Sequence, residues 1–376
     1  MRARDLGIRF GIGRPGRLNA ITDVAGVRVG HTTLISGEGP LVVGQGPVRS
    51  GVTVVVPHDG DVFVEPIFAG CHTLNGNGEL TGLEWIREAG KLVSPIAITN
   101  THSVGVVRDA LVQHAAERHS RTERFWSLPV VGETSDGTLN DINGFHVRPE
   151  HLDAALGDAR PGPVAEGNVG GGTGMICHEF KGGIGTASRV VGPEEGGWTV
   201  GVLVQANYGR RDLLRIDGVR VGEAIPITEI ASPDALPPGG VAPGAPRGGS
   251  GSIIVVIATD APLLPHQCAR LAQRAGLGIA RVGGTGGHTS GDLFICFATG
   301  NRDIPQPELR EDPRATVELR MLSDVYIDPL FLATIEATEE AIVNALVAAE
   351  TMTGIDGVTA HRLPHDRVRE VMLRGG

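Results

Sequence analysis

One junction in the sequence constrains the fold more than any other, because residues 247–260 read RGGSGSIIVVIATD. A glycine-rich segment runs into Ser252, and the apolar run Ile253–Ala258 follows at once. A short β-branched run of this kind is typical of a strand that is buried on both faces. The chain therefore has to pass from a flexible tether into the protein core at a single serine hydroxyl.

The tether, SPDALPPGGVAPGAPRGGSG at residues 232–251, has two interpretations. Proline and glycine oppose both helix and sheet formation, so the composition alone is typical of an interdomain linker. The abrupt junction with an apolar strand favours the other interpretation, which is a loop that is cut. At this level both interpretations stay open.

A cut before Ser252 would create an N-terminal nucleophile. A serine hydroxyl needs an adjacent base, and an N-terminal serine carries one in its α-amine, whose usual pKa is about 7.7 to 8.0. In such a maturation, Ser252 Oγ attacks the carbonyl of Gly251, the acyl group shifts from nitrogen to oxygen, and water releases the ester. Glycine before the serine can adopt backbone angles that are closed to other residues. Ser250, which also follows a glycine, is the competing site.

The rest of the chain mixes strands and helices, which is typical of an α/β layered architecture with sheets covered by helices. Short β-branched runs predict strands at residues 52–56, 96–99, 199–204 and 253–258, and a further strand is predicted at residues 292–298. Apolar residues at helical spacing predict helices at residues 80–90, 104–115 and 265–276, the last with Gly276 as its C-cap. Further on, Asp328-Pro329 opens a short helix, and Thr338 caps a longer one that ends near Gly354.

Charge and composition exclude several kinds of partner. The chain of 376 residues carries 33 Lys and Arg against 43 Asp and Glu, which gives a formal net charge of -10. Only 9 Phe, 3 Trp and 2 Tyr are available to stack on bases, so we expect no nucleic-acid partner. The N-terminus lacks the apolar core of a signal peptide, and no stretch reaches the roughly 18 apolar residues of a membrane span. We expect a soluble, cytoplasmic protein with no membrane association.

The sequence predicts neither a metal nor a cofactor. It lacks the phosphate-binding pattern G-x-x-x-x-G-K-[ST], the zinc pattern H-E-x-x-H and the nucleophile elbow G-x-S-x-G. The cysteines form no C-x-x-C pair and lie among apolar or small neighbours, which indicates free buried thiols in a reducing compartment. They are Cys71, Cys177, Cys268 and Cys296.

Six long motifs in order resemble those of the L-aminopeptidase/D-esterase and β-peptidyl aminopeptidase family. They are NGNGELTG (75–82), GETSDGTLNDINGF (132–145), EGNVGGGTGMICHEFKGGIGTASR (166–189), LVQANYGRRD (203–212), RGGSGSIIVVIATDAPLLPHQ (247–267) and SGDLFICFAT (290–299). The resemblance runs from ARDLGI near residue 3 to the C-terminal helix, so it covers essentially the full chain. It is highly specific for the family and much less so for the substrate.

The resemblance implies a self-cleaving hydrolase built as a single αββα domain over residues 1–376, with two stacked sheets and helices outside. Such a fold is similar to that of the N-terminal nucleophile hydrolases, with a different connectivity. The resemblance also implies maturation into an α chain of residues 1–251 and a β chain of residues 252–376, and assembly into a homotetramer of such pairs. Only the serine followed by IIVVIATD fits the family nucleophile, so the match selects Ser252 over Ser250.

Four further positions resemble the catalytic groups of the family. Ser290 and Asp292 resemble the pair that completes a serine-serine-carboxylate arrangement, and at i and i+2 of a strand their side chains share a face. Some members have Glu where Asp292 stands. Asn207 resembles the side-chain oxyanion donor and Ser135 the residue whose backbone N–H is the second donor, although some relatives carry Tyr or Leu there. On local sequence alone, Asp292 and Asn207 are equally typical of turns.

Substrate binding is carried over in the same way. Glu133 resembles the carboxylate that binds the free amine of the substrate, where a charge-assisted hydrogen bond would select a cationic N-terminus. On local sequence it is equally typical of a solvated loop. Asn75, Asn77 and the glycine run at residues 170–174 are further candidates for lining the site, although glycine-rich loops are usually just tight turns.

These residues together predict a serine aminopeptidase or amidase. It would release N-terminal residues from short peptides, amino-acid amides or esters through an acyl-enzyme on Ser252. Two alternatives remain. One is an ω-amino-acid oligomer hydrolase or an ornithine acetyltransferase of the same architecture, although both typically use threonine as the nucleophile. The other is an uncleaved scaffold that binds peptides without hydrolysing them.

Overall fold

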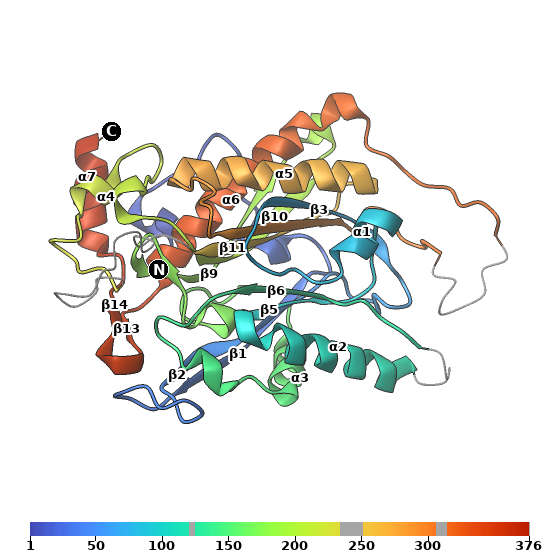
Figure 1. The fold of residues 1–376 in the computed structure, drawn as a ribbon. Helices are drawn as coiled ribbons and strands as arrows, with labels where there is room; N and C mark the ends of the chain where they lie inside the picture. Colours follow the sequence, from blue (N-terminus) through green and yellow to red (C-terminus); the bar gives the residue numbers. More distant parts are fainter. Residues whose placement is uncertain (120–124, 234–250, 306–313, 376) are drawn as a thin grey trace.

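Two β-sheets are stacked between layers of helices in the computed structural model, which describes residues 1–119, 125–233, 251–305 and 314–375 (Figure 1). The first sheet has the order β1-β2-β5-β6, and the second has the order β4-β3-β12-β11-β10-β9. The strands of the first are β1 (Arg28–Ser36), β2 (Val48–Val56), β5 (Ile96–Asn100) and β6 (Val130–Thr134). Those of the second are β3 (Ile67–Gly76), β4 (Lys91–Leu92), β9 (Gly183–Val190), β10 (Thr199–Asn207), β11 (Ser252–Thr259) and β12 (Gly291–Ala298).

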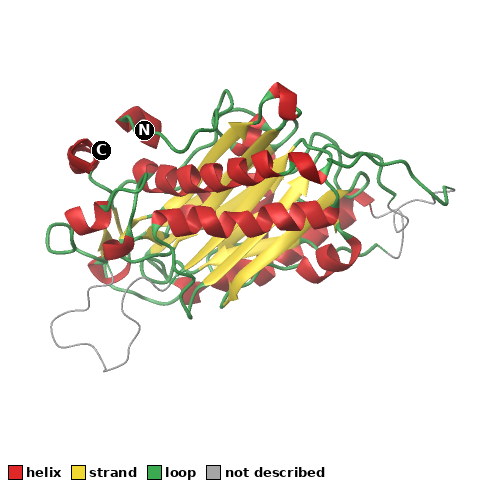
Figure 2. Cartoon of the chain, turned by 90° about the horizontal axis from the view of Figure 1, so that it is seen from above, coloured by secondary structure: helices red, strands yellow, loops and turns green. Residues whose placement is uncertain are grey.

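Helices cover the outer face of each sheet. The helices α5 (Pro265–Val282) and α6 (Asp328–Ala348) lie side by side over the second sheet (Figure 2), and α2 (Val104–His119) and α3 (Pro149–Asp158) cover the first. The remaining elements are α1 (Leu83–Ala89), α4 (Val221–Ala224), α7 (His365–Gly375) and the hairpins β7 (Ile176–Cys177) with β8 (Phe180–Lys181) and β13 (Met352–Thr353) with β14 (Thr359–Ala360). No helix in the described ranges combines the length and apolarity needed to cross a bilayer. The predicted αββα sandwich is confirmed.

Strand β11 explains why the layers form. Side chains alternate between the two faces of a strand. Alternate residues from Ile253 to Ile257 pack with the core under α5 and α6, whereas those from Ile254 to Ala258 pack in the core between the two sheets. All residues of β11 are buried. A strand that is apolar on both faces needs a layer on each side, so the run after Ser252 requires a central position.

The five predicted strands are present, but two helix predictions were wrong. Helix α5 does not end at Gly276, because its apolar stripe continues through the buried Ile279, and Gly283 ends it in the left-handed conformation with φ 105°. The two helices predicted after residue 327 are one continuous helix, α6. Thr338 lies inside this helix, and its hydroxyl donates to the carbonyl of Thr334 at 2.7 Å instead of capping a helix.

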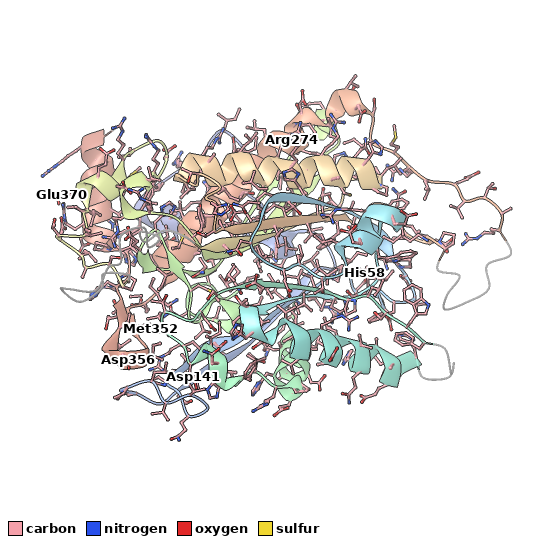
Figure 3. The ribbon with its side chains drawn as sticks, in the orientation of Figure 1. His58, Asp141, Arg274, Met352, Asp356 and Glu370 are labelled. Atoms are coloured by element: carbon pink, nitrogen blue, oxygen red, sulfur yellow. The ribbon has the colours of Figure 1, made fainter. Side chains whose placement is uncertain are left out.

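The loop between β1 and β2 exposes apolar side chains on a fixed backbone. Leu41, Val42 and Val43 are 37%, 47% and 60% exposed. The backbone N–H of Leu41 donates to Asp356 Oδ1 at 2.8 Å, and that of Gly44 donates to Asp141 Oδ2 at 2.7 Å. Figure 3 labels both aspartates, which lie beside this loop. The two contacts tie the loop to the β13–β14 hairpin and to the segment after β6.

A buried ion-pair cluster joins the second sheet to α6. The guanidinium of Arg189 in β9 contacts Glu336 at 3.0 Å and Glu340 at 2.8 Å, and all three side chains are at most 1% exposed. Glu340 also pairs with Arg4, whose Nε lies 2.6 Å from Glu340 Oε1. The cluster therefore links the N-terminal segment, the sheet and α6. Arg189, Glu336 and Glu340 are shielded from water, whereas Arg4 is partly exposed.

We expect the substitution Arg189→Met to lower the thermal midpoint of unfolding strongly. It would leave Glu336 buried without its cation, and breaking one partner of a buried pair costs about 3–5 kcal/mol. A matched control is Arg369→Ala, because Arg369 pairs with Asp366 on the surface, where a pair contributes about 1 kcal/mol or less. Differential scanning calorimetry of both variants tests this, and equal shifts would contradict it.

Candidate active site

The register of three neighbouring strands brings the predicted nucleophile and its partners to one end of the second sheet. Ser252, the first residue of β11, is opposite Asn207, the last residue of β10. The parallel pairing of β11 with β12 places Ile253 opposite Asp292, and Ser290 immediately precedes β12. Side chains from positions as far apart in the sequence as Asn207 and Asp292 thus lie close together. Ser252, Asn207, Ser290 and Asp292 are all buried.

A cavity of about 700 Å³ opens at this end of the sheet. Both sheets contribute to its lining. Glu133 and Ser135 lie at the end of β6 in the first sheet, and Asn207 and Ser252 come from β10 and β11 in the second sheet. Gly251 also lines the cavity, so the bond between Gly251 and Ser252 is accessible from it. The cavity is large enough to hold a small peptide or an amino-acid derivative.

The bond between Gly251 and Ser252 is contacted from both sides. Ser252 Oγ accepts a hydrogen bond from the backbone N–H of Gly291 at 3.0 Å. The Ser290 hydroxyl contacts the carbonyl oxygen of Gly251, and it also lies 2.6 Å from Asp292 Oδ1. These contacts hold the serine oxygen and the carbonyl of the same peptide bond in place.

The protonation state of Asp292 decides how Ser290 is used. A hydroxyl carries one proton, so Ser290 can donate to Gly251 only if Asp292 in turn donates a proton to Ser290 Oγ. Burial raises the pKa of Asp292, against the opposing effect of the hydrogen bonds from Ser290 and Asn75. The raised pKa favours the arrangement in which the carboxylic acid, the hydroxyl and the carbonyl form one chain of hydrogen bonds.

The side-chain amide of Asn207 is oriented by two backbone groups. Its Oδ1 accepts from the N–H of Ile176 at 2.8 Å, and its Nδ2 donates to the carbonyl of Ser135 at 2.9 Å. These two contacts fix which atom is nitrogen. An amide nitrogen carries two hydrogens, so one N–H of Asn207 has no partner among the described residues and is available to a ligand in the cavity.

Glu133 is a buried carboxylate at the cavity wall. Its Oε1 accepts from the backbone N–H of Glu79 at 2.9 Å, and its Oε2 accepts from the hydroxyl of Thr101. Only 2% of the residue is exposed. Burial raises the pKa of Glu133, while the hydrogen bonds from Thr101 and Glu79 act in the opposite direction. A buried carboxylate that borders a cavity is suited to bind a cationic group of a ligand.

The two predicted asparagines mainly support the segment that carries Ser290. Asn75 accepts from the N–H of Asp292 at 2.6 Å and donates to the carbonyl of Gly287 at 3.0 Å, and it does not line the cavity. Asn77 does line it, but its side chain donates to the carbonyl of Thr289 at 2.7 Å. Both side chains therefore position the chain just before β12.

The glycine run at residues 170–174 does not line the cavity but fills a gap between the two sheets. A Cβ atom at Gly171 would lie 2.2 Å from Gln205 Oε1 and 2.7 Å from the carbonyl oxygen of Ile98. No side chain fits there, so glycine is required by packing. Ser250 and most of the tether lie outside the described residues.

Sequence reasoning missed the backbone donors and the side chains that orient the predicted groups. The N–H groups of Gly291 and Ile176 have no side-chain signature, and only the three-dimensional register reveals them. Thr101 was also missed, although it lies two residues after the end of the predicted strand 96–99. The cysteines are free thiols, and within the described ranges no three His, Cys, Asp or Glu side chains cluster as metal ligands would.

Comparison with known sequences identifies the family. The profile of peptidase family S58 matches residues 19–360. The β-peptidyl aminopeptidase BapA of Sphingosinicella microcystinivorans is 51% identical over 378 residues, which cover 99% of this chain and 92% of that protein. The match is therefore close and extends over nearly the whole length of both proteins.

Solved structures agree with this assignment. A β-aminopeptidase from Burkholderia sp. superposes with a TM-score of 0.90 at 54% identity and covers 100% of this chain and 99% of its own. The L-aminopeptidase D-Ala-esterase/amidase of Ochrobactrum anthropi, described as a prototype of the serine aminopeptidases and a new variant among the Ntn hydrolase fold, superposes with a TM-score of 0.87 at 45% identity, covering 99% and 98%. The expected similarity to the N-terminal nucleophile hydrolases is confirmed. The chain belongs to peptidase family S58 and is a hydrolase with serine aminopeptidase or amidase activity.

Proposed function

We propose that this peptidase activates itself by cutting between Gly251 and Ser252, and that the new N-terminal Ser252 is the catalytic nucleophile. The observation that carries the proposal is the set of contacts around this peptide bond. The N–H of Gly291 holds Ser252 Oγ, and Ser290 contacts the carbonyl oxygen of Gly251. The proposal treats residues 1–376 as one αββα domain that matures into chains 1–251 and 252–376.

In the self-cleavage step, Ser252 Oγ bonds to the carbonyl carbon of Gly251 and the bond to the Ser252 nitrogen breaks. The hydroxyl proton passes to the leaving nitrogen, and water then hydrolyses the ester to give a Gly251 carboxylate and a free amine. Ser290, hydrogen-bonded to a protonated Asp292, stabilises the negative charge that develops on the carbonyl oxygen. Glycine is required before the cut because a Cβ at Gly251 would lie 1.9 Å from the carbonyl oxygen of Asn207.

In the catalytic cycle, the free α-amine of Ser252 takes the proton from Oγ as it attacks the substrate carbonyl. The unpartnered N–H of Asn207 and the backbone N–H of Ser135 stabilise the oxyanion. Ser290 and Asp292 orient the amine and relay its proton to the leaving nitrogen or oxygen of the substrate. The bond between the carbonyl carbon and that atom then breaks, and the leaving amine or alcohol departs, which gives the acyl-enzyme. Water then attacks the acyl-enzyme and releases the amino acid.

The substrates in this proposal are short peptides, amino-acid amides and esters with a free N-terminal amine. Ionised Glu133 binds the ammonium group of the substrate through a charge-assisted hydrogen bond. Asn77 forms part of the cavity wall. Because close relatives are named β-peptidyl aminopeptidases, we include N-terminal β-amino-acyl residues among the substrates.

The proposal includes a homotetramer of cleaved pairs and a cytoplasmic location. The exposed Leu41, Val42 and Val43, held on a fixed loop, are suited to contact another copy of the chain. The free thiols suit a reducing compartment. Membership of a peptidase family favours hydrolysis over the uncleaved peptide-binding scaffold, and a serine nucleophile favours it over the threonine-dependent acyltransferases.

Intact-mass spectrometry of the purified protein tests the self-cleavage. We expect two chains that separate after Gly251 in the wild type and one full-length chain in the Ser252→Ala variant, because alanine has no hydroxyl to attack the carbonyl. The control is Ser36→Ala, a serine at the exposed end of β1, which should cleave as the wild type does. Cleavage of the Ser252→Ala variant at the same bond would refute the mechanism.

The Glu133→Gln variant tests recognition of the amine. Loss of a hydrogen bond to a charged group costs about 2 kcal/mol, so we expect KM to rise roughly 30-fold with a smaller change in kcat. Burial raises the pKa of Glu133, so in the wild type the ionised form is lost as the pH falls through a value above the ordinary 4.5. The acidic decline in kcat/KM that this causes should disappear in the variant.

The matched control for amine recognition is Glu79→Gln. Glu79 lines the same cavity, and its only hydrogen bond to Glu133 comes from its backbone N–H, which the substitution keeps. Its side-chain charge acts on Glu133 by repulsion, as a nearby like charge. The KM of the Glu79→Gln variant should therefore differ from that of the wild type by less than about 3-fold. Steady-state kinetics on an amino-acid amide measure both variants across pH. An equal rise in KM for the two would show that the cavity selects the amine by its overall charge instead of by Glu133.

A further inference from the structure

Lys181 is a fully buried ammonium group that the mechanism above does not use. It lies in β8 with an exposed fraction of 0%. Its Nζ donates to the backbone carbonyls of Met175 at 2.8 Å, Gly182 at 2.9 Å and Gly172 at 3.3 Å. An ammonium has three donors, so these contacts use all of them. No carboxylate pairs with this lysine among the described residues, which is rare for a buried charge.

The surroundings of Lys181 provide no counter-charge. Burial lowers the pKa of Lys181 to about 7, and the neighbouring Cys177 acts in the opposite direction. Burial raises the pKa of Cys177 to about 12. A thiol with such a pKa is neutral near pH 7. Near pH 7 the amine of Lys181 is therefore partly protonated, and the described residues offer its Nζ only backbone carbonyls as partners. The side chain acts by holding that backbone.

One of these carbonyls belongs to the peptide group that orients Asn207. The C=O of Met175 and the N–H of Ile176 are parts of the same planar, trans peptide unit, so they point in opposite directions. The C=O accepts from Lys181, and the N–H donates to Asn207 Oδ1 at 2.8 Å. The N–H of Gly182 also donates to the Met175 carbonyl at 2.8 Å, which completes a fixed hairpin between β7 and β8.

Rotation of this peptide plane would reverse the oxyanion donor. If the Met175 carbonyl turned towards Asn207, it would attract the amide nitrogen and favour a flipped side chain. The flipped amide would present Oδ1 to the carbonyl of Ser135 and to the cavity. An oxygen in that position repels an oxyanion instead of donating to it.

We propose that Lys181 is a positioning residue for catalysis: by holding the Met175–Ile176 peptide plane, it keeps the amide N–H of Asn207 directed into the cavity. This inference rests on the proposed role of Asn207 as an oxyanion donor. It predicts that the loss of Lys181 lowers the rate of the chemical step and leaves substrate affinity nearly unchanged. It also predicts that Lys181 acts entirely through Asn207.

A double-mutant cycle of Lys181→Met, Asn207→Ala and the combined variant tests the inference. We expect Lys181→Met to lower kcat roughly 10-fold to 100-fold with KM within about 3-fold, since removal of an oxyanion donor costs about 100-fold to 1,000-fold. The combined variant should be no slower than Asn207→Ala alone. Intact-mass spectrometry gives the cleaved fraction of each preparation, to which kcat is normalised.

The outcomes separate this inference from the proposed function. If Asn207→Ala leaves kcat unchanged, the oxyanion role of Asn207 is wrong. If Asn207→Ala is slow while Lys181→Met is not, only the inference about Lys181 fails. Losses that multiply in the combined variant would indicate a general structural role of Lys181 and would overturn the inference.

Two further variants control for folding. Lys91→Met removes another lysine whose Nζ donates to a backbone carbonyl, that of Pro305, away from the cavity, and kcat should stay at the wild-type value. Lys181→Gln keeps two N–H donors without the charge, so it replaces Lys181→Met if that variant does not fold. Its kcat should lie between those of the wild type and Asn207→Ala, and a wild-type kcat would contradict the inference.

Discussion

The pairing of β11 with β10 and β12 is the constraint on which the rest of this structure depends. Side chains alternate along a strand, so a slip of one residue would exchange the side chains of β11 that pack under α5 and α6 with those that pack between the sheets. The same slip would move Ser252 away from Asn207 and from the N–H of Gly291. Burial of apolar side chains on both faces therefore fixes the geometry of the candidate site as well as the core. Stability and catalysis share one cause here.

The site also depends on the contact between the two sheets. Glu133 belongs to the first sheet and Ser252 to the second, so their separation is set by how the sheets are joined. Gln205 in β10 crosses the interface, and its side-chain nitrogen donates to the carbonyl of Thr99 and to the hydroxyl of Thr134, each at 2.9 Å. A polar bridge next to Glu133 thus fixes the distance over which a substrate amine and its carbonyl have to fit.

Much of the fold followed from local patterns, because buried strands have a strong signature. Each predicted strand was short and mainly apolar, most were β-branched, and each is present. The ends of helices were harder to predict: Gly276 looked like a stop signal, but tertiary packing of α5 over the second sheet outweighs the cost of one glycine inside a helix. Thr338 was misread as a cap for a different reason, because its hydroxyl donates to the carbonyl of Thr334 within the helix.

The candidate site was predictable only as far as it consists of side chains. The motifs pointed to Ser252, Ser290 and Asp292, which the sheet register brings together. The interpretation of residues 232–251 as a linker between domains is not supported, because β10 before the tether and β11 after it are neighbours in one sheet. Backbone donors such as the N–H of Ile176 depend on the orientation of a peptide plane, for which a sequence carries no signal.

The order of strands in the second sheet has a consequence for a chain that is cut before Ser252. The strands that follow the cut, β11 and β12, lie between β3 and β10, which precede it. The two fragments of such a chain would be interleaved, and neither could leave without breaking a ladder of hydrogen bonds on both sides. Once unfolded, however, the fragments would have to find each other again as separate molecules. Maturation would thus convert a reversible folding equilibrium into persistence that is governed by the rate of unfolding.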